Sequence, residues 1–411
     1  MKIYKFGGAS VSSADAIRNV AEIVKLVNGK LIVVVSAMGK TTNALEVLVR
    51  KYCLGETFQQ ELQSIQNYHQ EIMDELELRN RELPAQQWQQ FYEHLQKKPS
   101  TNFDYEYDQI VSFGELLSTS IVSAFLEENK QANRWIDIRS CLITDSNYRE
   151  ANVDWEKTET CSKTKFVGSE LFITQGFIGG TSTRETTTLG REGSDYSAAI
   201  VASVLRAESV SIWKNVPGVL NANPQDFDCT EKLDELSYKE AIELAYSGAN
   251  IIHPKTMKPL HNKSIPLYVR SFEAPELEGT IIHRVYKKLQ LPPIYIQKEK
   301  QALITLQTLD ISFVSVMELA DVFQFFKENR IKVNLIQQAA VQISFCIDEP
   351  EFNIEEVVHK LSQNFKVLYN NGLTLATIRF YDDESIERMI GNRTVLMQQK
   401  SRKTIKMVLQ A

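Results

Sequence analysis

The chain has few of the features that mark metal sites, disulfide frameworks or membrane proteins. Its five cysteines are widely scattered and never spaced as C-x-x-C, which favours reduced thiols in a cytoplasmic protein. Its six histidines show no metal-ligand spacing either, so we expect no metal site built from protein nitrogen or sulfur. No apolar run approaches ~18 residues, the length that spans a membrane, and the N-terminus lacks the apolar region of a signal peptide.

Excess positive charge is absent as well. The 411 residues carry a formal net charge of −6 at pH 7, which gives no electrostatic basis for binding nucleic acid or an anionic membrane. A bound nucleotide would therefore depend on local positive groups. The apolar fraction of 43% and the charged fraction of 24% are ordinary for a globular protein, and the length is sufficient for two or three domains.

Up to about residue 286, apolar runs alternate with amphipathic helical patterns. The run Leu31–Val35 is continuous and β-branched, as in a parallel strand buried on both faces. Similar strands are predicted at 171–178, 210–213 and 266–269, and helices at 14–26, 196–205 and 238–246. The alternation predicts an α/β fold, a mainly parallel sheet sandwiched by helices. Ligands of such sheets bind beyond the carboxyl ends of the strands, where the pattern places Lys5, Ser36, Gly176 and Lys214.

Two parts of the chain depart from this alternation. Residues 55–98 are rich in Gln, Glu and Leu at helical spacing, which predicts a helical insertion, either a mobile lobe over the site or a rigid decoration. The paired prolines of Leu289–Pro293 mark a boundary between a domain of residues 1–288 and one of residues 298–411.

The C-terminal part has its own element order. From Ala302 the order β-α-β-β-α-β predicts an α+β, ferredoxin-type module with an antiparallel sheet. The residues after Tyr381 offer one short helix and two strands. These elements are too few for a complete module of the same kind, so we expect a truncated second module.

A phosphate-binding arrangement stands at the very start of the chain. A predicted strand runs into Lys5, the pair Gly7-Gly8 and Ser10, and an amphipathic helix follows. Glycine lets a ligand approach the backbone, a helix start offers free N–H groups, and the lysine adds a point charge. The spacing differs from those of the P-loop and of G-x-G-x-x-G. Taken alone, such a turn is more often structural.

Two further polar segments follow predicted strands or begin predicted helices. Residues 36–43 combine a glycine with hydroxyl groups that could hold a carboxylate or merely cap a helix. Glu115 follows a glycine at the start of an apolar helix, where an acid is usually only a partner of the helix dipole. Neither segment is decisive alone.

The richest cluster is 186–197. It places three threonines, two glycines, Arg191, Ser194 and Asp195 directly before a helix. This set supplies several hydroxyl and backbone donors, one acid, and a guanidinium able to clamp a carboxylate or phosphate. The Pro-Gly turn within 213–224 adds apolar walls suited to an adenine base. The residues of 186–197 favour a ligand site over a plain surface loop, whereas the turn within 213–224 would be unremarkable by itself.

Six segments stand in the order found in aspartate kinases, and the chain resembles that family up to about residue 285. They are 5–11, 113–118, 175–178, 186–196, 213–224 and 248–254. Six collinear motifs are far more specific than any one of them. Aspartate kinases belong to the amino-acid kinase superfamily, and the module after Ala302 looks like the ACT regulatory domain that they carry at this place.

The resemblance implies transfer of the γ-phosphoryl group of Mg-ATP to the β-carboxylate of L-aspartate. The product would be 4-phospho-L-aspartate, at the first step of lysine, threonine and methionine biosynthesis. No general base is required because the nucleophile is already an anion, so catalysis reduces to positioning and charge neutralisation. Mg²⁺ would be held mainly by phosphate oxygens and water rather than by a protein cage.

The resemblance also implies roles for particular residues. Lys5 would stabilise charge on the transferring group, and Asp195 would orient Lys5 and the substrate; these are the two catalytic residues. Glu115 would receive the substrate ammonium and Arg191 a substrate carboxylate. The full substrate-binding set is Thr42, Glu115, Arg191 and Ser194. The full ATP-binding set is Lys5, Gly7, Gly8, Ser10, Lys214, Asn215 and Val219.

Some positions differ from the usual family pattern. Ala9 stands where Thr is usual, Lys214-Asn215 where Thr-Asp is usual, and Gln225 where Arg is usual, so we expect altered ATP affinity rather than altered chemistry. The regulatory part differs at Met317-Glu318 and Val333-Asn334, which argues against feedback by the expected effectors, lysine and threonine. ACT-like edges commonly pair between chains, so a homodimer is expected.

Two alternatives of other classes stay open. One is a different kinase of the superfamily, acting on glutamate, acetylglutamate or a nucleotide; the spacing from Glu115 to Arg191 and the C-terminal module argue against it. The other is a catalytically silent amino-acid-binding regulator. The presence of Lys5, Glu115, Arg191 and Asp195 together argues against that alternative.

Overall fold

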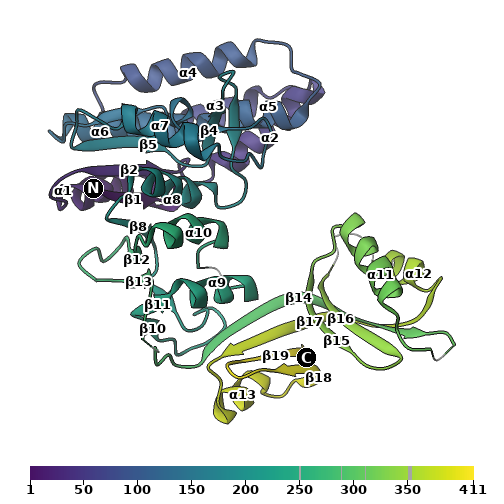
Figure 1. Cartoon of the computed structure of the whole chain (residues 1–411). Coiled ribbons are helices and arrows are strands. Elements are labelled where there is room, and N and C mark those ends of the chain that lie inside the picture. The colour runs from purple at the N-terminus through teal and green to yellow at the C-terminus, as the bar shows by residue number, and fades with distance from the viewer. Residues whose placement is uncertain (250, 288, 311, 350–353) are drawn as a thin grey trace. The chain divides into compact units, whose positions relative to one another are not determined.

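The structure, a computed structural model, describes all residues except 250, 288, 311 and 350–353 (Figure 1). The chain divides into two compact units. Unit 1 comprises Met1–Val219, Lys232–Ile242 and Ile252–Lys288. Unit 2 comprises Leu220–Glu231, Glu243–Ile251 and Leu289–Ala411. Each unit has its own sheet and its own core.

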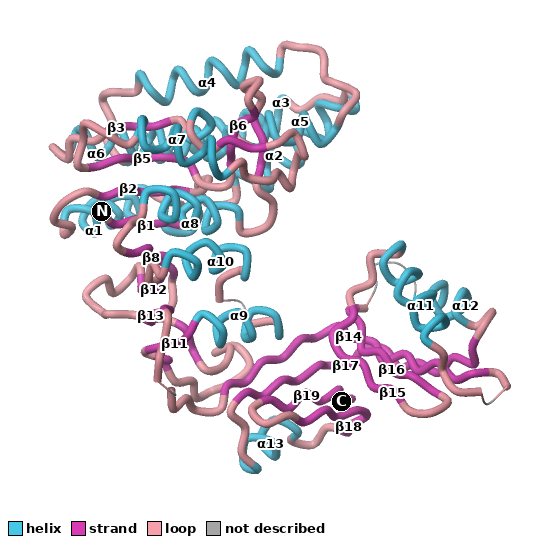
Figure 2. The backbone as a smooth tube through the Cα atoms, viewed as in Figure 1, coloured by secondary structure: helices cyan, strands magenta, loops and turns pink. Residues whose placement is uncertain are grey.

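Unit 1 is built on an eight-stranded sheet with the order β11-β13-β12-β8-β1-β2-β5-β3 (Figure 2). Its pairs are parallel except for β12 with β13. The strands are β1 Lys2–Phe6, β2 Leu31–Val35, β3 Arg134–Ile136, β5 Leu171–Gln175, β8 Ser209–Lys214, β11 Glu235–Ser237, β12 Leu267–Ser271 and β13 Thr280–His283. The predicted parallel α/β sheet is confirmed. The central strands β2 and β5 are buried along their whole length, and β2 is a continuous apolar run, because helices cover both faces.

Helices cover both faces of this sheet, and alternate side chains of β1 point to opposite faces. Tyr4 and Phe6 share a core with α1 (Ala14–Lys25) and α6 (Phe113–Glu128). Lys5 therefore points to the opposite face, where α8 (Gly193–Leu205) contacts β1, β2 and β8. Helices α7 (Trp155–Lys165) and α10 (Pro254–Lys263) contact α8.

The remaining helices of unit 1 include those of the predicted insertion. They are α2 Thr41–Leu54, α3 Gln59–Glu75, α4 Glu82–Leu95 and α5 Phe103–Val111, with one-turn 3₁₀ helices η1 Gly8–Val11 and η2 Ile138–Ser140. Helix α9 (Tyr238–Ser247) begins in unit 1 and ends in unit 2. The segment Phe103–Glu128 is long and apolar enough to cross a membrane by length and composition, yet 94% of its most apolar window is buried inside the protein. This segment, which contains α5 and α6, is therefore a pair of core helices of unit 1.

The predicted insertion is helical, as α3 and α4 show. Its apolar stripe is buried: Phe91 stacks on Phe113 of α6 with ring centroids 4.6 Å apart. Tyr68 Oη donates a hydrogen bond to the carbonyl oxygen of Ser12 at 2.8 Å. These contacts fix α3 and α4 to the rest of unit 1. Motion of this lobe stays a prediction.

The strand predicted over 171–178 is wrong in its last part. The chain leaves the sheet after Gln175, and β6 (Ile178–Thr181) joins a separate three-stranded sheet with β4 (Ile143–Thr144) and β7 (Thr186–Thr188). A Cβ at Gly176 would lie only 2.5 Å from the Ser194 side chain, and Phe177 has a φ of +68°. The turn exists because the start of α8 packs directly on it.

Unit 2 is built on a six-stranded antiparallel sheet with the order β15-β16-β14-β17-β19-β18. Its strands are β14 Ile294–Thr308, β15 Val333–Gln338, β16 Gln342–Asp348, β17 Phe365–Arg379, β18 Thr394–Lys400 and β19 Thr404–Gln410. Its helices are α11 Val316–Glu328, α12 Ile354–Leu361 and α13 Asp383–Ile390. The predicted order of strands and helices is confirmed. A short ribbon of β9 (Val219–Leu220) and β10 (Lys232–Leu233) completes the strands.

The two long strands β14 and β17 join two halves of this sheet (Figure 1). One half packs on α11 and α12 through a core that includes Ile304, Val322 and Phe345. The other half packs on α13 through Ile378 and Met407. The C-terminal elements therefore extend the first module's sheet, and share its long strands, rather than forming a separate small domain.

Candidate active site

The carboxyl ends of four parallel strands lie side by side in unit 1. In register, Lys5 faces Val34 of β2 and Ile212 of β8, and Val35 faces Gln175 of β5. The residues that follow these strands therefore emerge at one edge of the sheet. The expectation that Lys5, Ser36, Gly176 and Lys214 share this edge is confirmed.

Lys5 and Asp195 form the central ion pair of this edge. Lys5 Nζ lies 2.7 Å from Asp195 Oδ1, and the side chains are only 11% and 6% exposed. Asp195 stands in the first turn of α8, where the helix dipole favours a negative charge. The pair places a nearly dry ammonium group at the end of β1, held in one position by its carboxylate partner.

Glu115 lies in the first turn of α6 and is buried. Its Oε1 accepts a hydrogen bond from the backbone N–H of Ala37 at 3.1 Å, whereas its buried Oε2 has no hydrogen-bond partner among the described residues. Burial raises the pKa of Glu115 to about 8, against smaller lowering effects of the Ala37 N–H and of Lys5. A buried acid with one unsatisfied oxygen is suited to receive a cationic group.

The glycine turn after β1 is packed tightly against the turn after β2. A Cβ at Gly8 would lie 2.8 Å from the carbonyl oxygen of Ala37, and the backbone N–H of Gly39 donates to the carbonyl oxygen of Gly8 at 3.0 Å. Gly7 caps the short helix η1, in which Ser10 is buried. Helix α1 begins later, after its N-cap Ser13. The two turns thus form one backbone-lined wall beside Lys5.

The segment before α8 carries Arg191 and Ser194. Arg191 is exposed and, within the described part of the chain, makes no hydrogen bond or ion pair; Ser194 is buried against Gly176. Helix α8 begins at Gly193, three residues before the predicted start at Tyr196. Ser194 and Asp195 therefore lie within the first helical turn, which fixes their direction.

The other predicted site residues lie on neighbouring elements of unit 1. Thr42 is the second residue of α2 and is half-buried. Lys214 ends β8, half-buried, and Asn215 after it is exposed. Val219 is buried, and its N–H donates to Thr280 Oγ1 at 2.8 Å. Gln225, at one of the unusual positions, belongs to unit 2.

Sequence reasoning missed Asp108 of α5. It is fully buried, and its Oδ2 accepts hydrogen bonds from the backbone N–H groups of Arg149 and Thr188, at 2.9 and 2.8 Å. Its Oδ1 accepts from Thr188 Oγ1 at 2.7 Å. Burial raises its pKa to about 6, opposed by these hydrogen bonds. No element is predicted over residues 103–111, so the sequence pattern carried no signal for Asp108. Its hydrogen bonds to Thr188 fix β7, which leads to Arg191.

No metal cage stands among these groups. In the described ranges, no three His, Cys, Asp or Glu side chains come together in a way that could hold a metal ion. The positive donors at this edge are the Lys5 ammonium group and backbone N–H groups, which suit phosphate oxygens.

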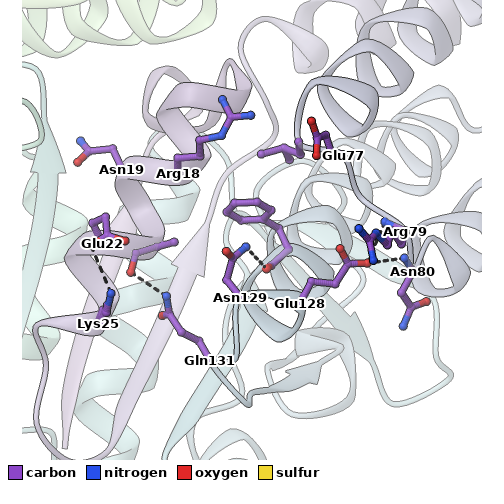
Figure 3. Close-up of a pocket in the computed structure, with 13 residues that line it drawn as sticks. Arg18, Asn19, Glu22, Lys25, Glu77, Arg79, Asn80, Glu128, Asn129 and Gln131 are labelled. Atoms are coloured by element: carbon purple, nitrogen blue, oxygen red, sulfur yellow. Dashed lines mark hydrogen bonds and ion pairs between the residues drawn. The ribbon is translucent and has the colours of Figure 1, made fainter.

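Unit 1 also has a separate pocket of about 980 Å³ (Figure 3). It is lined by α1, by the connection between α3 and α4, and by the end of α6, and it contains none of the predicted site residues. Cations such as Arg18 and Arg79 alternate there with acids such as Glu22 and Glu128. This mixed lining selects no ligand charge, so the strand edge is the better candidate.

Known proteins resemble the chain over its whole length. Residues 1–271 match the Amino acid kinase family. Lysine-sensitive aspartokinase 3 of Escherichia coli is 32% identical over 361 residues, which cover 84% of this chain and 78% of that protein. The chain belongs to the aspartokinase branch of the amino acid kinase family.

Two crystal structures of E. coli aspartokinase III support the same assignment. The complex with lysine and aspartate matches with a TM-score of 0.82 at 27% identity, covering 99% of this chain and 95% of the other. The complex with aspartate and ADP matches with a TM-score of 0.81 at 28% identity, covering 100% and 96%. The carrot (Daucus carota) bifunctional aspartokinase/homoserine dehydrogenase is 29% identical over 90% of this chain, which spans only 42% of that longer aspartokinase.

Proposed function

We propose that this aspartokinase-family chain transfers the γ-phosphoryl group of ATP to the β-carboxylate of L-aspartate, giving 4-phospho-L-aspartate. The observation that carries the proposal is the group of three ionisable side chains at one strand edge. A nearly dry Lys5–Asp195 pair stands beside a buried Glu115 whose second oxygen has no hydrogen-bond partner in the described part of the chain. Support also comes from the E. coli relative, whose structure contains aspartate and ADP.

The surroundings of each side chain suit it to one role in the reaction. Glu115 receives the substrate ammonium, which would supply its unsatisfied oxygen with a charge-assisted hydrogen bond. Arg191, exposed and unpaired among the described residues, binds a substrate carboxylate bidentately. Thr42 and Ser194 add hydroxyl contacts. Lys5 stabilises charge on the transferring phosphoryl group, and Asp195 holds Lys5 in place.

The chemistry requires little beyond this arrangement. The attacking β-carboxylate is already ionised, so the protein has only to bring it in line with the phosphoryl group and to offset negative charge. Fixed donors in a water-poor site do this without reorganising during the reaction. Asp195 is engaged by Lys5 and is not required as a base.

ATP lies along the glycine wall and β8 in this proposal. Gly7, Gly8, Ser10 and Lys5 hold the β- and γ-phosphates, and Lys214, Asn215 and Val219 frame the rest of the nucleotide. Mg²⁺, when bound, neutralises phosphate charge, and the phosphates and water supply most of its ligands.

We place the catalytic domain at residues 1–288 and a regulatory, ACT-like domain at 298–411. Lysine remains a candidate effector, since the E. coli relative is lysine-sensitive; threonine remains one on the family resemblance alone. Two contacts argue for a weak response here. Glu318 is already used by the capping box of α11 with Ser315, and the Asn334 amide is bonded to Lys298, Gln301 and Asp348.

We further propose that the chain acts in the cytoplasm as a homodimer paired through its ACT-like part. These two points rest on the family resemblance and on the scattered cysteines.

A substrate panel tests the activity. ADP release is measured with aspartate, glutamate, acetylglutamate and UMP, each with Mg-ATP. The proposal predicts release with aspartate only. Release with another acceptor would assign a different kinase activity, and tight aspartate binding without any release would indicate a regulator.

A further inference from the structure

Two side chains tie the segment around Arg191 to the start of α10. Glu192 Oε2 accepts a hydrogen bond from the backbone N–H of His253 at 2.7 Å. Lys255 Nζ donates a hydrogen bond to the carbonyl oxygen of Leu189 at 3.1 Å. The tethered residues Leu189 and Glu192 stand on either side of Arg191 in the chain, so both ends of this short segment are held.

The segment needs such support because its backbone is unusual. Glu192 has a φ of +52°, in the left-handed region that favours glycine, and Gly190 has a φ of +74°. A Cβ at Gly193 would lie 2.6 Å from the Phe177 ring. A glutamate in a left-handed conformation costs free energy that the surrounding contacts must offset. The hydrogen bond from the His253 N–H to the Glu192 carboxylate is one such contact.

The start of α10 is well placed to hold a carboxylate. His253 is the N-cap of α10, and its Nδ1 accepts a hydrogen bond from the N–H of Lys255 at 3.2 Å. The helix start carries a partial positive charge that favours the Glu192 carboxylate. Lys255 Nζ also lies over the Tyr196 ring, 4.7 Å from its centroid. Lys255 therefore contacts the chain both before Arg191 and directly after Asp195.

We propose that Glu192 and Lys255 are positioning residues that fix the direction of Arg191 toward the substrate carboxylate. Neither side chain contacts the reacting atoms. They act by reducing the number of conformations of residues 189–193, so that Arg191 loses less entropy when it binds substrate. This inference rests on the proposed role of Arg191 in aspartate binding.

Kinetic measurements on matched variants test the proposal. Glu192→Ala and Lys255→Met are each expected to raise the KM for aspartate about tenfold, the effect of losing one hydrogen bond to a charged group. The kcat and the KM for ATP are expected to change less than about threefold. Glu192→Gln keeps an oxygen acceptor for the His253 N–H, so it should stay within about threefold of the wild-type KM.

A glycine variant separates the tether from the backbone strain. Glu192→Gly relieves the left-handed conformation but removes the carboxylate, so it should behave like Glu192→Ala. Lys263→Met changes an exposed lysine at the other end of α10 and serves as a control. Arg206→Gly relieves an equal φ of +52° at the far end of α8 and is the second control. Both controls should leave the KM for aspartate unchanged.

A double-mutant cycle asks whether the tethers act through Arg191. In an Arg191→Ala background, Glu192→Ala should raise the KM for aspartate less than twofold further, because the group that it positions is gone. Equal effects in both backgrounds would overturn the proposal. So would a wild-type KM in Glu192→Gly.

Hydrogen exchange measures the tethers without any substrate. Amides of residues 189–194 should exchange faster in Glu192→Ala and Lys255→Met than in wild type and in Lys263→Met. Unchanged exchange would overturn the positioning role even in an active enzyme. Faster exchange in a protein that does not turn over aspartate would instead locate the error in the proposed function.

Discussion

Lys5 of β1 and Asp195 of α8 are separated by 190 positions in the chain, yet their charged groups lie 2.7 Å apart. The pair exists because Lys5 points to the face of the sheet that α8 covers, and because Asp195 stands in the first turn of that helix. It connects the glycine wall after β1 with the segment that carries Arg191 and Ser194.

Loss of the acid should disable Lys5 without removing it. Asp195→Asn takes away the charge that holds the ammonium group, so we expect kcat for aspartate-dependent ADP release to fall about 100-fold. The KM for ATP should change much less. A kcat within threefold of wild type would show that Lys5 is positioned by other groups.

Glu115 should make stability depend on pH. Its pKa is raised from 4.5 to about 8, so the folded state favours the protonated acid. This stabilisation is complete below about pH 4.5 and is lost as the pH rises to about 8. Glu115→Gln should therefore melt at the same temperature as wild type near pH 4.5 and at a higher temperature at pH 8. An equal difference at both pH values would contradict the raised pKa.

Asp108 should matter for stability more than for chemistry. Asp108→Ala leaves the N–H groups of Arg149 and Thr188 without their acceptor, and we expect a loss of about 3 kcal/mol in the free energy of unfolding. Urea denaturation of the full-length protein, followed through the unfolding of unit 1, measures this loss. Asp104→Ala, at an exposed position of the same helix, is the control and should cost less than about 0.5 kcal/mol.

The unusual Asn215 should affect nucleotide affinity only. Asn215 is exposed and directly follows β8, and it is not part of the Lys5–Asp195 pair. Asn215→Asp should change the KM for ATP severalfold and leave kcat unchanged, as initial rates at varied ATP will show. A KM that does not respond would remove Asn215 from the nucleotide site.

Much of unit 1 was predictable from local patterns. Continuous β-branched runs such as Leu31–Val35 define the central strands, and parallel strands bring their carboxyl ends together, which places Lys5 near Gly176 and Lys214. The family motifs added Glu115, Arg191 and Asp195 as a set. The contacts of these residues, such as the hydrogen bond that the Ala37 N–H donates to Glu115, are visible only in the structure.

The errors have nonlocal causes. The strand break after Gln175 depends on Ser194, which packs on Gly176 from a distant part of the chain. The sequence pattern placed the first strand of the C-terminal module from Ala302, whereas β14 begins at Ile294. Its pairing with β17 has a bulge between Lys298 and Gln301, where Lys300 has a φ of +54°. Asp108 was overlooked because its partners come from β7 and from the Arg149 turn. In each case the deciding contact joins segments that sequence periodicity treats separately.

The most direct test measures the acyl phosphate itself. Wild type and Lys5→Ala are incubated with Mg-ATP, aspartate and hydroxylamine, which traps 4-phospho-L-aspartate as a hydroxamate. The account predicts aspartate-dependent formation of hydroxamate by wild type and a rate of formation about 1,000-fold lower for Lys5→Ala. Thermal melting curves must show that both proteins are folded. Equal hydroxamate formation by the two proteins, or none by wild type, would contradict it.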